Sequence, residues 1–238
     1  MVDIHCHILP GVDDGAESWE IAIEMCEIAI KDGIDHIVAS PHANDEYKYD
    51  REKHQACLDQ LHEKIDGKLK FSLGCDFHLS YDNIQDLFAH PERYCIGESR
   101  YLLVEFSDFG LPPNTTELFS QLILRRITPI VTHPERNPLL QRSPKQVVEW
   151  ANEGALVQVT ANSLTGRWGS TAKKTIKYLA EHGAVHVLAT DAHDTRSRPP
   201  ILSAAQAEMA KIVGDDAARA MVEDIPRAIV SGQLLTTA

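Results

Sequence analysis

Apolar stretches of strand length alternate along the chain with longer segments in which apolar residues recur at helical spacing. The strand-like stretches cover residues 1–7, 34–40, 69–75, 101–106, 128–132, 155–160 and 185–190. Residues 18–31 carry the first helical pattern, which ends at Gly33. Because parallel strands need helical crossovers, the alternation predicts an α/β fold with a barrel of seven parallel strands.

Local signals place several helix starts and one long loop. Asn114 predicts one helix start, and Ser143 followed by Pro144 predicts another. Residues 44–51 are polar and charged, so a loop over one end of the fold is expected there. Two or three helices are expected from residue 203 onward. No linker or repeat separates these elements, so residues 1–238 are predicted to form one domain.

The composition is acidic. Among 238 residues there are 23 Lys and Arg but 35 Asp and Glu, which gives a formal net charge of −12. Without a dense basic run, this balance argues against nucleic acid or an anionic membrane surface as the main partner. No apolar stretch approaches the roughly 20 residues that cross a bilayer, so no membrane insertion and a cytoplasmic location are expected. The five cysteines are scattered, which indicates reduced thiols.

Side chains of the types that bind metal ions follow most of the predicted strands. In a strand, alternate side chains share a face, so His5 and His7 point the same way at the end of the first strand. In α/β barrels, the site forms at the carboxyl ends of the strands. Every predicted strand except the sixth, which ends near Asn162, leads into a candidate ligand. The candidates are His5, His7, His42, Asp76, Glu105, His133, Asp191 and His193.

These candidates belong to short motifs that extend over nearly the whole chain. The motifs are Asp-Ile-His-Cys-His at 3–7, Val-Asp-Asp-Gly at 12–15, Ser-Pro-His at 40–42, Val-Glu-Phe at 104–106, Thr-His-Pro-Glu-Arg at 132–136, Thr-Asp-Ala-His at 190–193 and Arg-Pro-Pro at 198–200. Together they resemble the polymerase-and-histidinol-phosphatase (PHP) metallohydrolases, and within them the bacterial tyrosine phosphatases of capsule and exopolysaccharide systems. The resemblance implies a distorted (β/α)7 barrel with a metal site at the carboxyl ends of its strands.

The resemblance also implies three divalent metal ions. Manganese is expected, and iron, zinc and cobalt are alternatives for imidazole and carboxylate ligands without thiolate. The implied ligands are His5, His7 and Asp191 for the first ion, Glu105 and His133 for the second, Asp76 bridging both, and Asp14, His42 and His193 for the third. Four carboxylates and three divalent ions leave such a site with a net charge of about +2, which attracts an anion.

One ligand position leaves a choice between two residues, and two other positions depart from the family pattern. Asp13 and Asp14 are adjacent, and Asp14 is taken as the ligand by resemblance alone. The bridging residue is usually Glu in these tyrosine phosphatases, whereas this chain has the shorter Asp76. The residue after the Thr-His-Pro-Glu-Arg run is often aromatic in the family, whereas here it is Asn137, which is expected to alter how a substrate ring is held.

The implied activity is hydrolysis of phosphotyrosine on a protein. A bacterial tyrosine autokinase that controls exopolysaccharide or capsule synthesis is the expected partner. A metal-activated hydroxide would attack phosphorus without a covalent phosphoenzyme and release inorganic phosphate. The implied catalytic residues are Arg136, Arg198 and Asp191, and the two guanidinium groups would bind phosphate oxygens as forks.

Other activities fit parts of the sequence. One alternative is a PHP phosphoesterase for a small phosphomonoester such as histidinol phosphate, and another is a catalytically silent metal-binding scaffold. A cysteine phosphatase is disfavoured because the four residues between Cys95 and Arg100 are one too few for its phosphate loop. An amidohydrolase would be expected to use a metal-bridging Lys, and none of the predicted strands ends in Lys.

Overall fold

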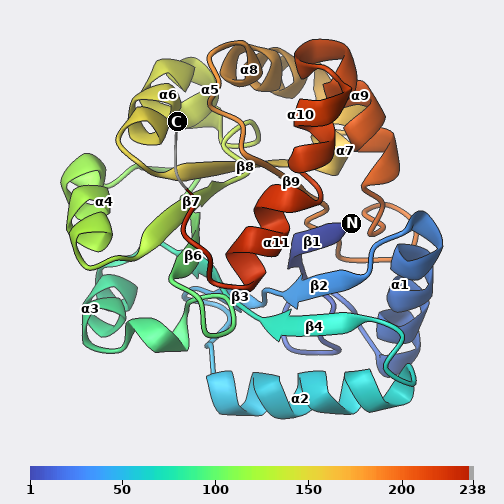
Figure 1. Ribbon diagram of the computed structural model, residues 1–238. Coiled ribbons are helices and arrows are strands. Elements are labelled where there is room, and N and C mark those ends of the chain that lie inside the picture. The colour runs from blue at the N-terminus through green and yellow to red at the C-terminus, as the bar shows by residue number, and fades with distance from the viewer. Residues whose placement is uncertain (236–238) are drawn as a thin grey trace.

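The computed structural model describes residues 1–235, in which strands and helices alternate along the chain (Figure 1). The strands are β1 (Val2–Cys6), β2 (His36–Ala39), β3 (His42–Ala43), β4 (Lys70–Leu73), β5 (Asp76–His78), β6 (Tyr101–Glu105), β7 (Thr128–Thr132), β8 (Leu156–Thr160) and β9 (Val187–Ala189). The helices are α1 (Trp19–Asp32), α2 (Arg51–Lys64), α3 (Tyr81–Ala89), the 3-10 helix η1 (Pro91–Arg93), α4 (Thr115–Leu124), α5 (Pro138–Arg142), α6 (Pro144–Asn152), α7 (Ala161–Thr165), α8 (Gly169–Glu181), α9 (Ser203–Val213), α10 (Asp215–Ala220) and α11 (Asp224–Val230).

Most of the predicted helices are confirmed. Asn114 and Ser143 precede α4 and α6 as predicted, although neither side chain makes a capping hydrogen bond. Asp50 caps α2 by accepting from the Lys53 N–H, so the polar loop ends one residue earlier than predicted. The hydrophobic pattern predicts none of α3, α5 and α7, which have 9, 5 and 5 residues. Helices this short contain too few turns for a periodic pattern to be recognised.

The strands form two parallel sheets, with the orders β1-β2-β4 and β3-β5-β6-β7-β8-β9. The mixed α/β architecture with parallel strands is therefore confirmed. The count of seven strands is not, because nine strands lie within residues 1–235. The two additional strands are β3 and β5, which follow β2 and β4 after short interruptions and belong to the other sheet.

Two local features explain these interruptions. Pro41 follows β2 and lacks the N–H that a ladder needs. Gly74 follows β4 at a close approach of two strands, where an added Cβ would lie 2.9 Å from Val38 Cγ1. Backbone pairing continues beside each break, because Gly74 N–H donates to Ala39 O at 2.8 Å and Asp76 N–H donates to Pro41 O at 3.0 Å. Each interruption therefore bends a strand without separating its two parts.

The first and last strands also meet. Cys6 forms a parallel bridge with Ala192, just beyond β9. His7 N–H donates to Ala192 O at 2.9 Å, and Asp191 N–H donates to His5 O at 2.8 Å. These bonds link the edges of the two sheets into a ring of strands, around which Figure 1 shows the longer helices.

Alternate strand residues form an apolar cluster within this ring, which we call the inner cluster. Its strand members include Val2, Ile4, Leu103 and Ile130, all completely buried, and Ile229 of α11 packs against them. Figure 1 shows α11 in the middle of the ring, beside β1. Residues on the opposite face of the strands join a larger cluster with the surrounding helices. The helix α11 thus covers the amino end of the strands and leaves the carboxyl end for polar groups.

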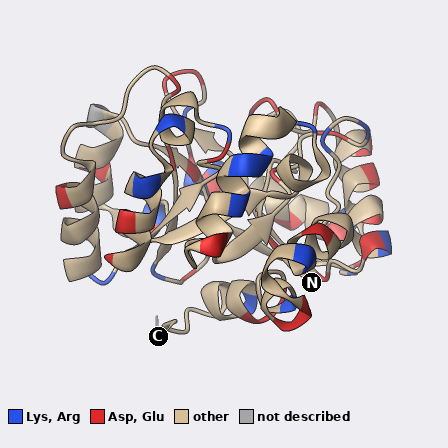
Figure 2. Cartoon of the chain, turned by 90° about the horizontal axis from the view of Figure 1, so that it is seen from above, with Lys and Arg blue, Asp and Glu red and all other residues tan. Residues whose placement is uncertain are grey.

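Charged residues are spread over the outside of the molecule. Figure 2 shows acidic and basic residues interspersed around the helices and loops, while the strands at the centre are mostly uncharged. None of the helices in the described part of the chain is long and apolar enough to cross a membrane.

Candidate metal centre

The nine predicted metal ligands lie together at the carboxyl ends of the strands. Their positions are set by the strands: His5 is the last residue but one of β1 and His7 lies just beyond it, His42 and Asp76 begin β3 and β5, which continue β2 and β4, Glu105 ends β6, His133 follows β7, and Asp191 and His193 follow β9. Asp14 comes from the loop between β1 and α1. Apart from Asp14, His42 and Glu105, which are partly exposed, all of these residues are buried.

A bulge in β1 explains why its two imidazoles point into the ring. The pairing of β1 with β2 shifts by one residue between Asp3 and Cys6. Before the shift, Val2 and Ile4 face the inner cluster, whereas Cys6 after it packs toward the helices. An extra residue in a strand moves the alternation to the other face. His5 and His7 therefore follow Ile4 on the inward side, directly above the inner cluster.

Asp76 is at the centre of the first group of ligands. Its Oδ2 atom lies 3.5 Å from His5 Nε2, 3.4 Å from His42 Nδ1 and 3.9 Å from His133 Nε2. This oxygen is buried and makes no hydrogen bond, and the same is true of His42 Nδ1. Ligands at about 2.1 Å from one metal ion are roughly 3.0 to 3.4 Å apart, so this spacing suits donors around an ion better than hydrogen bonds. The shorter Asp76 thus reaches the centre in place of the usual Glu.

A second group surrounds Asp14. Its Oδ1 atom lies 3.3 Å from His42 Nε2 and 3.3 Å from His193 Nε2. Donor atoms of these three residues and of His7 all lie within 4.8 Å of one another. Asp13 instead contacts the far side of His7, with Oδ2 at 2.8 Å from Nδ1. The neighbouring carboxylates are therefore separated by position: Asp14 faces the other ligands, and Asp13 orients one of them.

Asp191 joins the ligands to two arginines. Its Oδ1 atom lies 3.5 Å from His5 Nε2 and 3.4 Å from His7 Nε2. Its Oδ2 atom pairs with Arg136 and, at 2.5 Å, with Arg198. Asp191 has a φ of 51° in the left-handed region, and His133 has a φ of 33°. Non-glycine residues in this region are uncommon and concentrate at functional sites.

The protonation of the cluster follows from its mixed charges. Burial lowers the pKa of His5, but the charges of Asp76 and Asp191 and the contacts with Asp76 and Gln158 together outweigh burial and raise that pKa to about 9. For His42, the contacts with Asp14 and Glu105 outweigh burial and raise the pKa to about 12. Burial and the Asp76 charge act to raise the pKa of Glu105, but contacts with imidazoles lower it to about 2. Without metal ions, cationic imidazoles therefore neutralise the carboxylates, and bound cations would replace their protons.

Several polar residues that support the ligands are not found by the sequence pattern. Asp3 is buried and accepts from the N–H groups of His5 and Thr190, which fixes the bulge in β1. Gln158 on β8 lies with Oε1 at 2.9 Å from His5 Nδ1. His78 Nδ1 lies 3.7 Å from Glu105 Oε2. A polar residue at an inward position of an otherwise apolar strand is the sequence signal that could indicate such a supporting residue. Gln158, which lies between two valines, is the clearest case.

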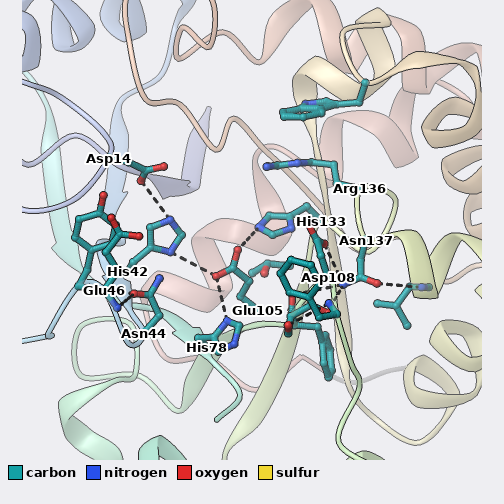
Figure 3. A pocket seen from close by; sticks show the side chains of 17 residues that line it. Asp14, His42, Asn44, Glu46, His78, Glu105, Asp108, His133, Arg136 and Asn137 are labelled. Atoms are coloured by element: carbon teal, nitrogen blue, oxygen red, sulfur yellow. Dashed lines mark hydrogen bonds and ion pairs between the residues drawn. The ribbon is translucent and has the colours of Figure 1, made fainter.

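The cluster opens into a cavity of about 400 Å³. Figure 3 shows Asp14, His42 and Glu105 meeting at the cavity, with Arg136 above His133. Tyr47, Phe109 and Trp168 also line it. Asn137 is largely buried beside the cavity: its Oδ1 accepts from two N–H groups of α5, and its Nδ2 donates to Ser107 O at 3.0 Å. Asn137 thus holds the loop after β6 against α5.

No cysteine is among the residues that line this cavity, within the part of the chain that the structure describes. Cys95 is buried, and burial raises the pKa of its thiol to about 11. A reactive cysteine needs a lowered pKa and access to solvent. These observations agree with the spacing argument against a cysteine phosphatase.

The whole chain is similar to metal-dependent tyrosine phosphatases of known structure. It is 33% identical to the tyrosine-protein phosphatase YwqE of Bacillus subtilis over 202 residues, which are 83% of this chain and 79% of YwqE. It is 29% identical to the tyrosine-protein phosphatase CpsB of Streptococcus pneumoniae, over 99% of this chain and all of CpsB. A crystal structure from a study of YwqE and CpsB as metal-dependent tyrosine phosphatases matches with a TM-score of 0.92 at 30% identity, covering 99% of this chain and 96% of that one.

A more distant likeness concerns the fold alone. A β-aspartyl dipeptidase from Fervidobacterium islandicum matches 99% of this chain and 74% of its own with a TM-score of 0.59 at 14% identity. The family model described as capsular polysaccharide synthesis, CpsB/CapC, matches residues 1–231. The chain therefore belongs to the CpsB/CapC family of capsular polysaccharide synthesis.

Proposed function

We propose that this chain is a metal-dependent protein-tyrosine phosphatase whose substrate is a phosphotyrosine protein, with a bacterial tyrosine kinase of capsule or exopolysaccharide synthesis as the partner. The observation that carries the proposal is the gathering of nine potential ligands around the unpartnered Asp76 Oδ2 and around Asp14, with Arg136 and Arg198 paired to Asp191 and Arg136 lining the adjoining cavity. The named activities of YwqE and CpsB support the same reaction for this chain. A cytoplasmic location fits that partner.

The ligand geometry supports three divalent ions, with manganese as the expected metal. We assign the first ion to His5, His7 and Asp191, the second to Glu105 and His133, with Asp76 shared by both, and the third to Asp14, His42 and His193. When bound, divalent ions lower the pKa of water to near neutrality and neutralise charge on phosphoryl oxygens. With four carboxylates, three such ions would give the centre a charge of about +2, which suits a phosphate dianion.

The two arginines bind the phosphate group. Both approach Asp191 Oδ2 at the edge of the cluster, and Arg136 also lines the cavity. A guanidinium fork can donate two parallel hydrogen bonds to the oxygens of a phosphate group. These bonds strengthen as charge spreads over the equatorial oxygens in the transition state. Arg136 and Arg198 therefore orient the phosphoryl group, and Asp191 aligns both arginines.

The leaving group explains the preference for tyrosine. A phenol has a pKa of about 10, several units below that of an alkyl alcohol, so a departing phenolate needs less protonation. Within the described residues, no further buried acid lies in the cavity beyond the ligands themselves. We therefore expect phosphotyrosine to be hydrolysed faster than phosphoserine.

We also propose that the strands form a single barrel within one domain. The two sheets, joined by the bridge between Cys6 and Ala192, act as one distorted (β/α)7 barrel if each interrupted strand is counted once with its continuation. A single domain over residues 1–238 is consistent with the inner cluster, which takes residues from β1, β2, β6, β7, β8, β9 and α11. The metal ions then close one end of this barrel and α11 the other.

The test is hydrolysis of a phosphotyrosine peptide by the purified protein, after chelator treatment and again after addition of Mn²⁺. We expect activity only with metal, and slower turnover of phosphoserine peptide and histidinol phosphate. Metal analysis of protein purified without added metal gives the stoichiometry. Equal activity with chelator would overturn the metal dependence, and faster turnover of histidinol phosphate would replace the proposed substrate class.

A further inference from the structure

One aromatic residue outside the ligand set contacts both arginines of the centre. Trp168 lies between α7 and α8 and lines the cavity. The guanidinium carbon of Arg136 lies 4.1 Å from the centre of the Trp168 ring, and that of Arg198 lies 5.9 Å away. A cation within about 6 Å of a tryptophan ring is attracted to its face. The indole therefore stands against the same two cations that pair with Asp191.

The local backbone keeps Trp168 at this place. The helix α7 ends at Gly166 with a φ of 107°, a conformation that side chains with a Cβ rarely adopt. Three residues later, at Gly169, the chain enters α8, so Trp168 is fixed between two helix ends. The residue is 37% exposed and lines the cavity.

The stack and the ion pair use different parts of the guanidinium. Stacking on an indole occupies the face of the planar group, whereas its five N–H donors lie in the plane and point outward from the edge. Arg136 can therefore release Asp191 and bind phosphate oxygens without leaving the ring of Trp168. The ring thus fixes the plane of the fork during the exchange of one anion for the other.

We propose that Trp168 is a positioning residue that acts through Arg136: its indole holds the guanidinium at the cavity so that the fork meets the phosphoryl group already oriented. The proposal rests on the proposed function, since it assigns a role within the same phosphate site. Arg198, at the longer distance, gains less from the ring. Rigid orientation before binding lowers the cost of ordering a long side chain.

The first test compares Trp168→Ala with Trp168→Phe in the metal-loaded protein. Losing a cation–π contact at a partly exposed site changes a rate or binding constant by up to about 10-fold. We therefore expect Trp168→Ala to lower kcat/KM on a phosphotyrosine peptide by about that factor. Inhibition by inorganic phosphate should weaken by a similar factor. Trp168→Phe keeps an aromatic face and should restore most of both. Metal content should stay normal in all variants.

A second test separates action through Arg136 from direct contact with substrate. If Trp168 acts through Arg136, then Trp168→Ala should cost nothing further in an Arg136→Ala background. Additive losses would overturn the proposal. So would an unchanged inhibition by phosphate combined with slower phosphotyrosine hydrolysis, because that pattern means the indole stacks on the substrate ring.

A matched control is available elsewhere in the chain. Arg125 stacks on Phe88 at 4.6 Å, and neither residue lines the cavity. Phe88→Leu removes this cation–π pair and should leave kinetics and phosphate inhibition unchanged. Calorimetric titration of the metal-loaded protein with inorganic phosphate keeps the two proposals apart. Weaker phosphate binding in Trp168→Ala supports the role of the indole even if phosphotyrosine proves to be the wrong substrate, and equal binding refutes it.

Discussion

At their amino end the strands enclose Val2, Leu103 and Ile130 beneath α11, whereas at their carboxyl end the same strands lead to His5, Glu105 and His133. The apolar end gains roughly 1.5 to 3 kcal/mol for each large side chain that is fully buried. The polar end gathers like charges, leaves Asp76 Oδ2 without a hydrogen bond, and holds two residues at positive φ. Stability and chemistry are therefore divided along each strand, and the apolar end maintains an arrangement that is unfavourable by itself.

The largest expected effect comes from the polar end. Asp76→Ala removes the carboxylate around which three imidazoles gather, so metal content should fall. Activity on a phosphotyrosine peptide should drop on the order of 10³-fold or more, the scale of several kcal/mol of transition-state stabilisation. Metal analysis and steady-state kinetics on the same preparation measure both. Full metal content with normal turnover would remove Asp76 from the centre.

A substitution at the apolar end should instead lower stability and leave metal content and activity unchanged. Ile130 is completely buried in the inner cluster, and Ile130→Ala should lower the free energy of unfolding by about 2 to 5 kcal/mol. The folded fraction should keep its metal content and turnover, because Ile130 is part of the inner cluster and is not among the proposed ligands. Denaturant unfolding of the metal-free protein gives the first quantity. Ile130→Val is the graded control, with an expected loss of about 0.5 to 1.5 kcal/mol.

A smaller effect is expected where the two ends meet, at the residues that orient the ligands. A proton on His5 Nδ1 that is donated to Gln158 leaves Nε2 free to face the other ligands. Gln158→Leu should therefore weaken metal affinity by about 10- to 100-fold and leave the ligand set intact. Metal titration against a competing chelator measures the change. Gln55→Leu on the exposed surface of α2 is the control, and an equal change there would show that the effect is not specific.

Per pH unit, the smallest effect is a pH dependence with a defined sign. In the metal-free protein the pKa of His5 is raised to about 9, so its extra stability is fully present below the unfolded value of about 6.5 and is lost as pH rises toward 9. Metal binding needs the neutral imidazole, so metal affinity should rise roughly tenfold for each pH unit over the same window. Stability of the metal-free protein and metal affinity should thus change in opposite directions between pH 6.5 and 9.

Proton release on metal binding gives a direct measurement. Calorimetry at pH 7 in buffers with different ionisation enthalpies should show protons leaving the protein as the metal is added. His5→Gln should release fewer protons. If metal affinity proves independent of pH over this window, His5 is not protonated in the metal-free state.

The sequence predicts the alternation of parallel strands and helices because apolar patterning is a local property, and it predicts the grouping of the nine candidate residues because the carboxyl ends of parallel strands meet. It does not predict the bulge between Asp3 and Cys6, since that shift depends on the register of β1 against β2, more than thirty residues further along the chain. Nor does it predict the strands β3 and β5. Their short lengths depend on the interruptions at Pro41 and Gly74 and on pairing with each other.

The sequence also does not predict the residues that orient the ligands, because their contacts join distant parts of the chain. Gln158 meets His5 across 153 residues of chain, and Trp168 meets Arg136 only when the ends of α7 and α8 are in place. Asp13 and Asp14 cannot be distinguished by sequence spacing. Their difference in space arises because the loop after β1 directs one carboxylate behind His7 and the other toward His193.

The contact between β1 and the segment after β9 also determines the order in which the molecule can be completed. Asp3 accepts from the Thr190 N–H across 187 residues, and His5 and Asp191 approach only when this contact exists. During synthesis, a chain that has emerged as far as β8 holds seven of the nine proposed ligands but lacks Asp191 and His193. A ligand that binds only the folded state stabilises it by mass action. Metal binding therefore stabilises chains that extend past His193 and distinguishes them from shorter folding intermediates.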